Sequence, residues 1–148
     1  MTEFQLDPRL ERDTFELGQL NGQTLLLMNN ALFPWLILVP RTHHQEVHHL
    51  SEGEQFNLLR SANALSQHLL TRFDTMKVNL AAIGNLVPQL HLHVVGRRVG
   101  DHAWPGVVWG HPEHVAYLPE QVRAIARGLK ADPAVESFTI NSELEAGE

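Results

Sequence analysis

The chain has 148 residues, of which 43% are hydrophobic and 19% are charged, as expected for one globular domain. It contains no cysteine, which excludes a disulfide scaffold, a thiolate zinc site and a cysteine nucleophile. The formal net charge of -6 argues against a surface that coats nucleic acid, so no nucleic-acid partner is expected. The unusual count is histidine, with ten residues against eleven Lys plus Arg.

Neither a targeting segment nor a membrane span is predicted. The start, Met1 to Phe4, lacks the basic-then-apolar pattern of a signal peptide. The longest apolar stretch, Leu32 to Val39, is interrupted by Pro34 and is too short to cross a bilayer. We therefore expect a cytoplasmic protein with no membrane partner.

The first third of the chain predicts a short helical turn followed by three strands. The helical turn is expected over 7–12. Two apolar-rich runs, 14–17 and 23–28, lie on either side of Asn21-Gly22, which supplies the positive-φ residues of a tight hairpin turn. The run 35–39 is wholly apolar, which is typical of a fully buried strand.

Two helices are predicted further along. Ser51 and Glu54 form a capping box, and apolar residues then recur at helical spacing as far as Phe73. A second, shorter helix is expected over about 119–130, where Pro-Glu opens the first turn and the missing proline N–H costs nothing.

Strands predicted near 77–82 and 90–97 bring the total to five. We therefore expect an α+β fold: a five-stranded, mostly antiparallel sheet with one long and one shorter helix, forming a single domain over 1–130. The remainder, 131–148, is rich in Glu and predicts an acidic, mobile C-terminal tail.

The strand near 90–97 carries the sharpest chemical pattern. Side chains alternate between the faces of a strand, about 3.3 Å apart per residue. One face therefore holds the three polar residues Gln89, His91 and His93, and the other is apolar. Three interpretations are open: a solvated face, a metal site that needs further ligands, or covalent catalysis in which one histidine attacks phosphorus.

The flanking sequence separates these interpretations. The segment 84–98, Gly-Asn-Leu-Val-Pro-Gln-Leu-His-Leu-His-Val-Val-Gly-Arg-Arg, resembles the signature of the histidine triad (HIT) superfamily. The segment 35–43, an apolar strand that ends in Pro, Arg and His, is also similar to that family. The chain looks closest to a bacterial HIT-like subgroup with Pro-Gln where the first triad histidine would stand.

The resemblance implies a role for each triad position. His91 matches the nucleophile that attacks the α-phosphorus of a nucleotide and forms a nucleotidyl-histidine intermediate. His93 matches the residue that hydrogen-bonds a phosphate oxygen. The family chemistry requires no metal or other cofactor. Gln89 replaces the first histidine, and a carboxamide cannot act as a general acid.

The resemblance also indicates residues that bind the nucleotide. Asn30 stands where the family places an acidic residue that holds the ribose, and Asn79 and Asn85 are candidates for ribose or phosphate contacts. Leu86 occupies the place of a phosphate-contacting Ser. A purine nucleotide is the expected small-molecule partner, and a homodimer is expected because family members commonly pair.

Three functions are therefore weighed. The first is a nucleotide phosphoramidase or dinucleoside polyphosphate hydrolase, or a nucleotidyl transferase, that works through His91. The second is a nucleotide-binding or regulatory module with little turnover, because of Gln89. The third is a metal-binding protein that uses His91 and His93.

Overall fold

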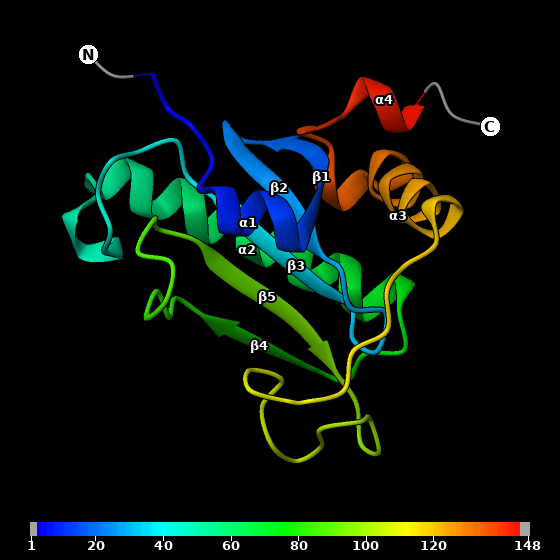
Figure 1. Cartoon of the computed structure of the whole chain (residues 1–148). Coiled ribbons are helices and arrows are strands. Elements are labelled where there is room, and N and C mark those ends of the chain that lie inside the picture. Colours follow the sequence, from blue (N-terminus) through cyan, green and yellow to red (C-terminus); the bar gives the residue numbers. More distant parts are fainter. Residues whose placement is uncertain (1–2, 146–148) are drawn as a thin grey trace.

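Six strands form one antiparallel sheet in the order β4-β5-β3-β2-β1-β6 in this computed structural model, which describes residues 3–145 (Figure 1). The strands are β1 (Thr14–Leu20), β2 (Gln23–Met28), β3 (Trp35–Val39), β4 (Lys77–Ala81), β5 (Leu92–Arg97) and β6 (Phe138–Ile140). The α-helices are α1 (Pro8–Asp13), α2 (Glu52–Arg72), α3 (Pro119–Ala131) and α4 (Ser142–Glu145), with 3-10 turns at Val47–His49 and Pro133–Val135. The expected α+β class is confirmed, but the expected count of five strands was wrong.

The additional strand comes from the segment that we expected to be a mobile acidic tail. Phe138 and Ile140 are buried, and β6 pairs with β1 opposite Gly18. A Cβ atom on Gly18 would lie 2.1 Å from the Thr139 carbonyl oxygen, so only glycine allows this close approach. The tail prediction was therefore wrong for 138–140, and its last residues, 146–148, lie outside the described residues.

The hairpin between β1 and β2 turns as its sequence predicts. Asn21 and Gly22 have φ of 51° and 80°, which is the left-handed region that such a turn requires. The predicted capping box is also present, because Ser51 accepts a hydrogen bond from the Glu54 N–H while the Glu54 carboxylate accepts one from Ser51.

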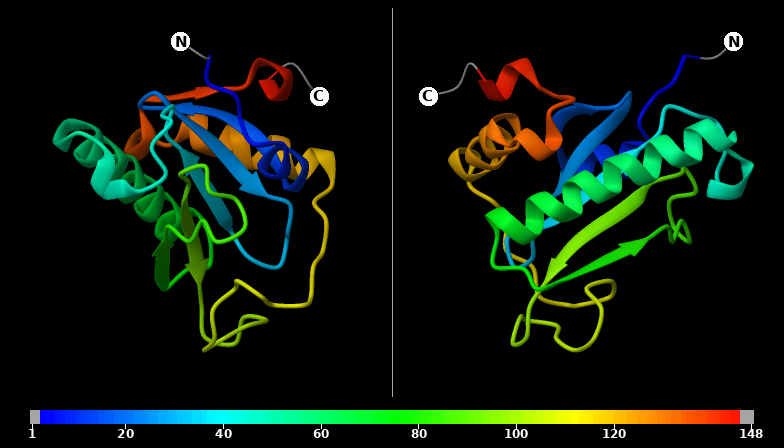
Figure 2. Two further views of the ribbon diagram at one scale, coloured as in Figure 1. Left: turned by 60° about the vertical axis from the view of Figure 1, so that its left-hand side comes forward. Right: turned by 180° about the vertical axis from the view of Figure 1, so that it is seen from behind.

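Helices α2 and α3 cover one face of the sheet, and α2 lies in front when the molecule is seen from behind (Figure 2). Leucines of β1, β2 and β3 on this face pack against buried residues of both helices. None of the helices within residues 3–145 is long and apolar enough to cross a membrane.

The opposite face is covered by α1, by part of the N-terminal segment that precedes it and by part of the long connection between β5 and α3. A second apolar cluster lies here: Leu10, Leu26, Phe33, Trp35, Ile37, Val39, Val95 and Val108. His93 pairs with Ile37 of β3 and lies on this face. His93 is therefore buried beneath irregular segments rather than beneath the long helices.

Candidate active site

The two histidines of the predicted polar row lie side by side where β5 begins. The strand was expected from residue 90, but it starts at Leu92, so His91 and Gln89 precede it. Both imidazoles are buried, with ring centroids 4.9 Å apart and the ring planes inclined at 66°. Leu92 and Val94 pack on the helical side, which confirms the alternation predicted from the sequence.

His91 is oriented by the backbone of its own segment. Its Nδ1 lies 2.7 Å from the Gln89 carbonyl oxygen, which can only accept, so Nδ1 carries the proton. In the neutral ring the lone pair is then on Nε2, the arrangement that a nucleophilic histidine needs.

His93 is held in the opposite tautomer. The Trp35 indole N–H, which can only donate, lies 2.9 Å from His93 Nδ1, so in the neutral ring the proton is on Nε2. Burial, and secondarily the charge of His91, lower the pKa of His93 to about 3. Near neutral pH the His93 ring is therefore an uncharged N–H donor beside the ring of His91.

A cavity of about 440 Å³ opens beside the two imidazoles, a size within the usual range for small-molecule sites. Its lining comes from α1, β2, β3, the loop before β5 and the connection after β5. The lining residues are Arg9, Leu10, Asp13, Met28, Trp35, Ile83, Gly84, Asn85, Leu86, Val87, His91, His93, Trp109 and Gly110. Apolar walls with a few charged groups suit a planar base joined to an anionic group.

Trp109 forms an aromatic wall of this cavity. Its ring meets His93 edge-on at 5.3 Å between centroids and Trp35 at 5.9 Å. The connection that carries it is held by a buried ion pair in which Arg97 Nε donates to Asp101 at 2.8 Å. Burial opposes ionisation of Asp101, but hydrogen bonds from Arg97 and from two backbone N–H groups lower its pKa to about 2.

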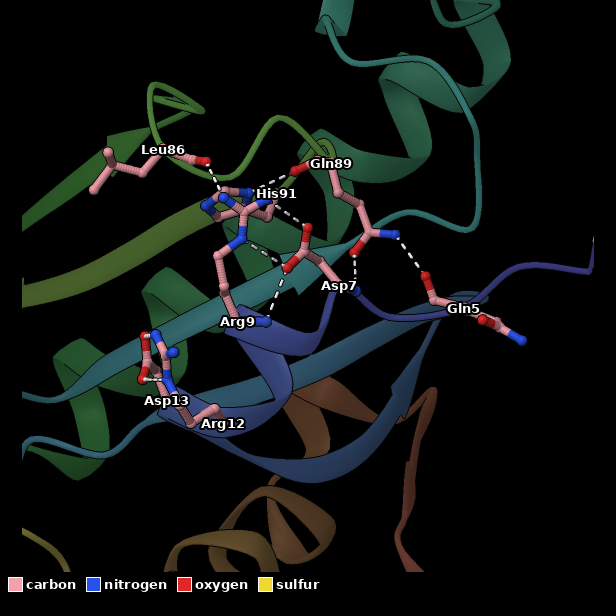
Figure 3. A network of polar contacts seen from close by, with 8 residues as sticks. All are labelled: Gln5, Asp7, Arg9, Arg12, Asp13, Leu86, Gln89 and His91. Carbon is pink, nitrogen blue, oxygen red and sulfur yellow. Dashed lines mark hydrogen bonds and ion pairs between the residues drawn. The ribbon is translucent and has the colours of Figure 1, made fainter.

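The Gln89 side chain contacts the N-terminal segment (Figure 3). Its Oε1 accepts a hydrogen bond from the Asp7 N–H, and its Nε2 donates to the Gln5 carbonyl oxygen, each at 2.8 Å. Both ends of the carboxamide are therefore bonded to backbone more than eighty residues away in sequence.

Arg9 links the same segment to the loop before β5. Its Nε and Nη2 donate to the two carboxylate oxygens of Asp7, and its Nη1 donates to the Leu86 carbonyl oxygen at 2.6 Å. The hydrogen bonds from Arg9 lower the pKa of Asp7 and raise that of Arg9, so the pair is ionised near neutral pH.

The three asparagines expected to bind nucleotide lie in different places. Asn85 lines the cavity. Asn30 is buried, and its Oδ1 accepts from the backbone N–H groups of Leu32 and Val115. Asn79 accepts from Arg97 Nη1 at 2.9 Å. Neither Asn30 nor Asn79 is among the residues that line the cavity.

The remaining histidines do not join this cluster. His44, His48 and His49 are exposed, and their rings lie near one another in the loop before α2. His68 is buried in α2 and bonds Asp132 at 2.6 Å. Within residues 3–145, no group of three or more His, Asp or Glu is arranged to hold a metal ion.

Sequence reasoning did not identify Arg9, Asp13, Trp35 or Trp109 as individual site residues. Trp35 looked like an ordinary strand residue, and nothing in the spacing near residue 9 indicated contact with residue 86. Trp109 is one of two tryptophans in the loop-like stretch 102–110, a pattern that indicates a packed flap over a site or a dimer contact but does not identify His93 as the neighbour.

This α+β fold, with adjacent histidines of opposite tautomer beside a cavity, defines a histidine triad protein. The HIT domain family model matches residues 9–100, and the chain belongs to this family. A comparison with curated proteins gave no match.

Solved structures of histidine triad proteins agree with the family match. The protein from Marinobacter aquaeolei VT8 is 42% identical, with a TM-score of 0.86, and the match covers 93% of this chain and 100% of that one. The protein from Bradyrhizobium japonicum is 38% identical, with a TM-score of 0.82 and coverage of 87% and 97%. The Sinorhizobium meliloti protein is 38% identical, with a TM-score of 0.83 and coverage of 90% and 96%.

Proposed function

We propose that this protein is a nucleotide hydrolase or nucleotidyl transferase that acts at the α-phosphate of a nucleotide through a covalent intermediate on His91. The observation that carries the proposal is the fixed Nδ1–H contact to the Gln89 carbonyl oxygen, which keeps the neutral Nε2 lone pair available in a ring that lines the cavity.

The reaction proceeds in two displacements. His91 Nε2 bonds to the α-phosphorus while the bond from phosphorus to the leaving group breaks, and the electron pair departs with that group. Water then attacks the same phosphorus, the P–N bond breaks, and one proton of the water is lost to solvent. The Nε2–H of His93 donates to a phosphate oxygen as charge moves during both steps.

The nucleoside occupies the apolar part of the cavity in this proposal. Met28, Trp35 and Trp109 offer the faces and edges that a purine base packs against. Asn85 is available to the sugar or phosphate, whereas the Asn30 oxygen is bonded to backbone and supports the connection that closes this side.

The test uses nucleoside phosphoramidates and dinucleoside polyphosphates with the wild type, His91→Ala and, as a matched control, the exposed His114→Ala. We expect turnover that His91→Ala abolishes and His114→Ala retains. A rapid-quench mass spectrum of the wild type should show a nucleotidyl adduct on His91. Turnover that survives in His91→Ala would overturn the proposal.

A nucleotide-binding module with little turnover is the second candidate. It is favoured by the Gln89 carboxamide, which cannot deliver a proton and is already bonded to the N-terminal segment. Tight nucleotide binding in the same assays, without any His91-dependent product, would establish this function instead.

We also expect a homodimer. β4 is an edge strand that pairs only with β5 within residues 3–145, and it exposes Leu80. Sedimentation analysis of the full chain would show a mass of two chains if the expectation holds.

A further inference from the structure

The N-terminal segment, residues 3–13, contributes Arg9, Leu10 and Asp13 to a wall of the site, and its residues 3–8 precede the part of the chain that the HIT domain model matches. Two independent sets of contacts hold it there. Gln89 bonds the backbone of Gln5 and Asp7, and Arg9 bonds the backbone of Leu86 (Figure 3). The position that departs from the triad pattern is therefore one of the two anchors of this wall.

Arg9 keeps part of its donor capacity unused. A guanidinium has five N–H donors. In Arg9, one N–H of Nε and one of Nη2 donate to Asp7, and one N–H of Nη1 donates to Leu86. Two donors remain, one on each Nη atom. Among the described residues that line the cavity, Arg9 is the only lysine or arginine.

Charge at this position complements the chemistry of Gln89. Because a carboxamide cannot protonate a leaving group, departure is easiest for a group that leaves as a stable anion, such as a phosphate chain. A cation beside that chain lowers the energy of the developing charge. His93 reaches the site from β5 and is tied to Trp35, whereas Arg9 reaches it from α1, so the two donors serve different oxygens.

We propose that Arg9 recognises the phosphate chain of the leaving group and makes the site selective for nucleoside polyphosphates, and that Gln89 is the positioning residue that holds the Arg9 segment in place. This inference rests on the proposed function. When the bond between the α-phosphorus and the bridging oxygen breaks, its electron pair remains on the departing phosphate chain, next to the two unused guanidinium N–H groups.

The test compares a dinucleoside polyphosphate with a nucleoside phosphoramidate whose leaving group is an amine. Arg9→Ala should lower kcat/KM for the polyphosphate by about tenfold to a hundredfold, the value of a charge-assisted hydrogen bond. The phosphoramidate rate should change by less than about threefold, since its leaving group lacks phosphate. Arg9→Lys should restore part of the polyphosphate rate.

Arg60→Ala is the control, because Arg60 is an exposed arginine of α2 that does not line the cavity. It should leave both rates unchanged. Gln89→Ala should reproduce the selective loss and also speed hydrogen exchange in residues 5–9. An equal loss of both rates in Arg9→Ala would show a merely structural role and overturn the proposal, as would no loss.

If the proposed function itself fails, the wild type will show no turnover that His91→Ala abolishes, and this result is distinct from the outcomes for Arg9. In that case, calorimetry with a nucleoside monophosphate and a triphosphate still decides the role of Arg9. A preference for the triphosphate that disappears in Arg9→Ala, is partly retained in Arg9→Lys and persists in Arg60→Ala supports phosphate recognition. Equal preference in all four proteins, or no nucleotide binding by the wild type, overturns it.

Discussion

The two faces of the sheet are built on different physical principles. The helical face, under α2 and α3, buries mainly apolar side chains packed by two regular helices, together with polar groups such as the His68–Asp132 pair that joins α2 to the end of α3. The face under α1 and the connection after β5 also buries His91, His93, Arg97 and Asp101, each with a specific polar partner or ring contact. Stability thus comes mainly from apolar packing on the helical face, whereas on the site face, under α1 and the connection after β5, it also depends on the polar groups that form the site.

The largest effect is expected from Asp101→Ala on the site face. The variant leaves the buried Arg97 guanidinium without its carboxylate, and breaking such a pair costs about 3–5 kcal/mol. Urea denaturation should show this loss. Asp74→Ala, at an exposed carboxylate that faces Arg98, should change stability by less than about 0.5 kcal/mol. Equal effects would show that the Arg97–Asp101 pair does not support this face.

Leu65→Ala probes the helical face. Leu65 is fully buried between α2 and the sheet, and truncation should cost about 2–5 kcal/mol from lost burial and a cavity. Leu59→Ala, on the same helix but half exposed, should cost much less. Both variants should keep their affinity for nucleotide under native conditions, which calorimetry can check. A loss of affinity in Leu65→Ala alone would indicate that the two faces are coupled.

The pH dependence of stability should carry a signature of His93. Its folded pKa of about 3 lies below the ordinary value of 6.5, so below pH 6.5 the unfolded chain binds a proton that the folded chain excludes. The free energy of unfolding should therefore fall with decreasing pH, by up to about 1.4 kcal/mol per pH unit, until pH approaches 3. His93→Gln should reduce this slope and His114→Gln should not, as denaturation at several pH values would show.

Asn30→Ala should have the smallest effect. The Leu32 and Val115 N–H groups lose a common acceptor, at a cost of about 1 kcal/mol. Hydrogen exchange at Val115 should accelerate. If nucleotide affinity fell strongly while this exchange stayed slow, Asn30 would be a direct ligand rather than a support of the connection. Asn63→Ala, at an exposed position of α2, serves as the control.

The helical face could be predicted from sequence more completely than the site face. Helical periodicity after Ser51 and the alternation around His93 are local signals, and both were confirmed. β6 was missed because the acidic composition of the segment masked the alternation of Phe138 and Ile140. The contacts of Gln89 with Gln5 and Asp7 join distant segments, and no local spacing reports them.

The indole of Trp35 has a consequence for how the site exchanges protons with solvent. The His93 ring lies with its centroid 4.9 Å from that of His91, so a positive charge on His93 would be buried close to a second imidazole. The Trp35 indole N–H does not ionise near neutral pH. It already donates a hydrogen bond to Nδ1 of His93, the nitrogen that would take up a second proton on that ring. His93 therefore keeps its single proton on Nε2 near neutral pH and presents the same hydrogen-bond donor to a phosphate oxygen throughout that range.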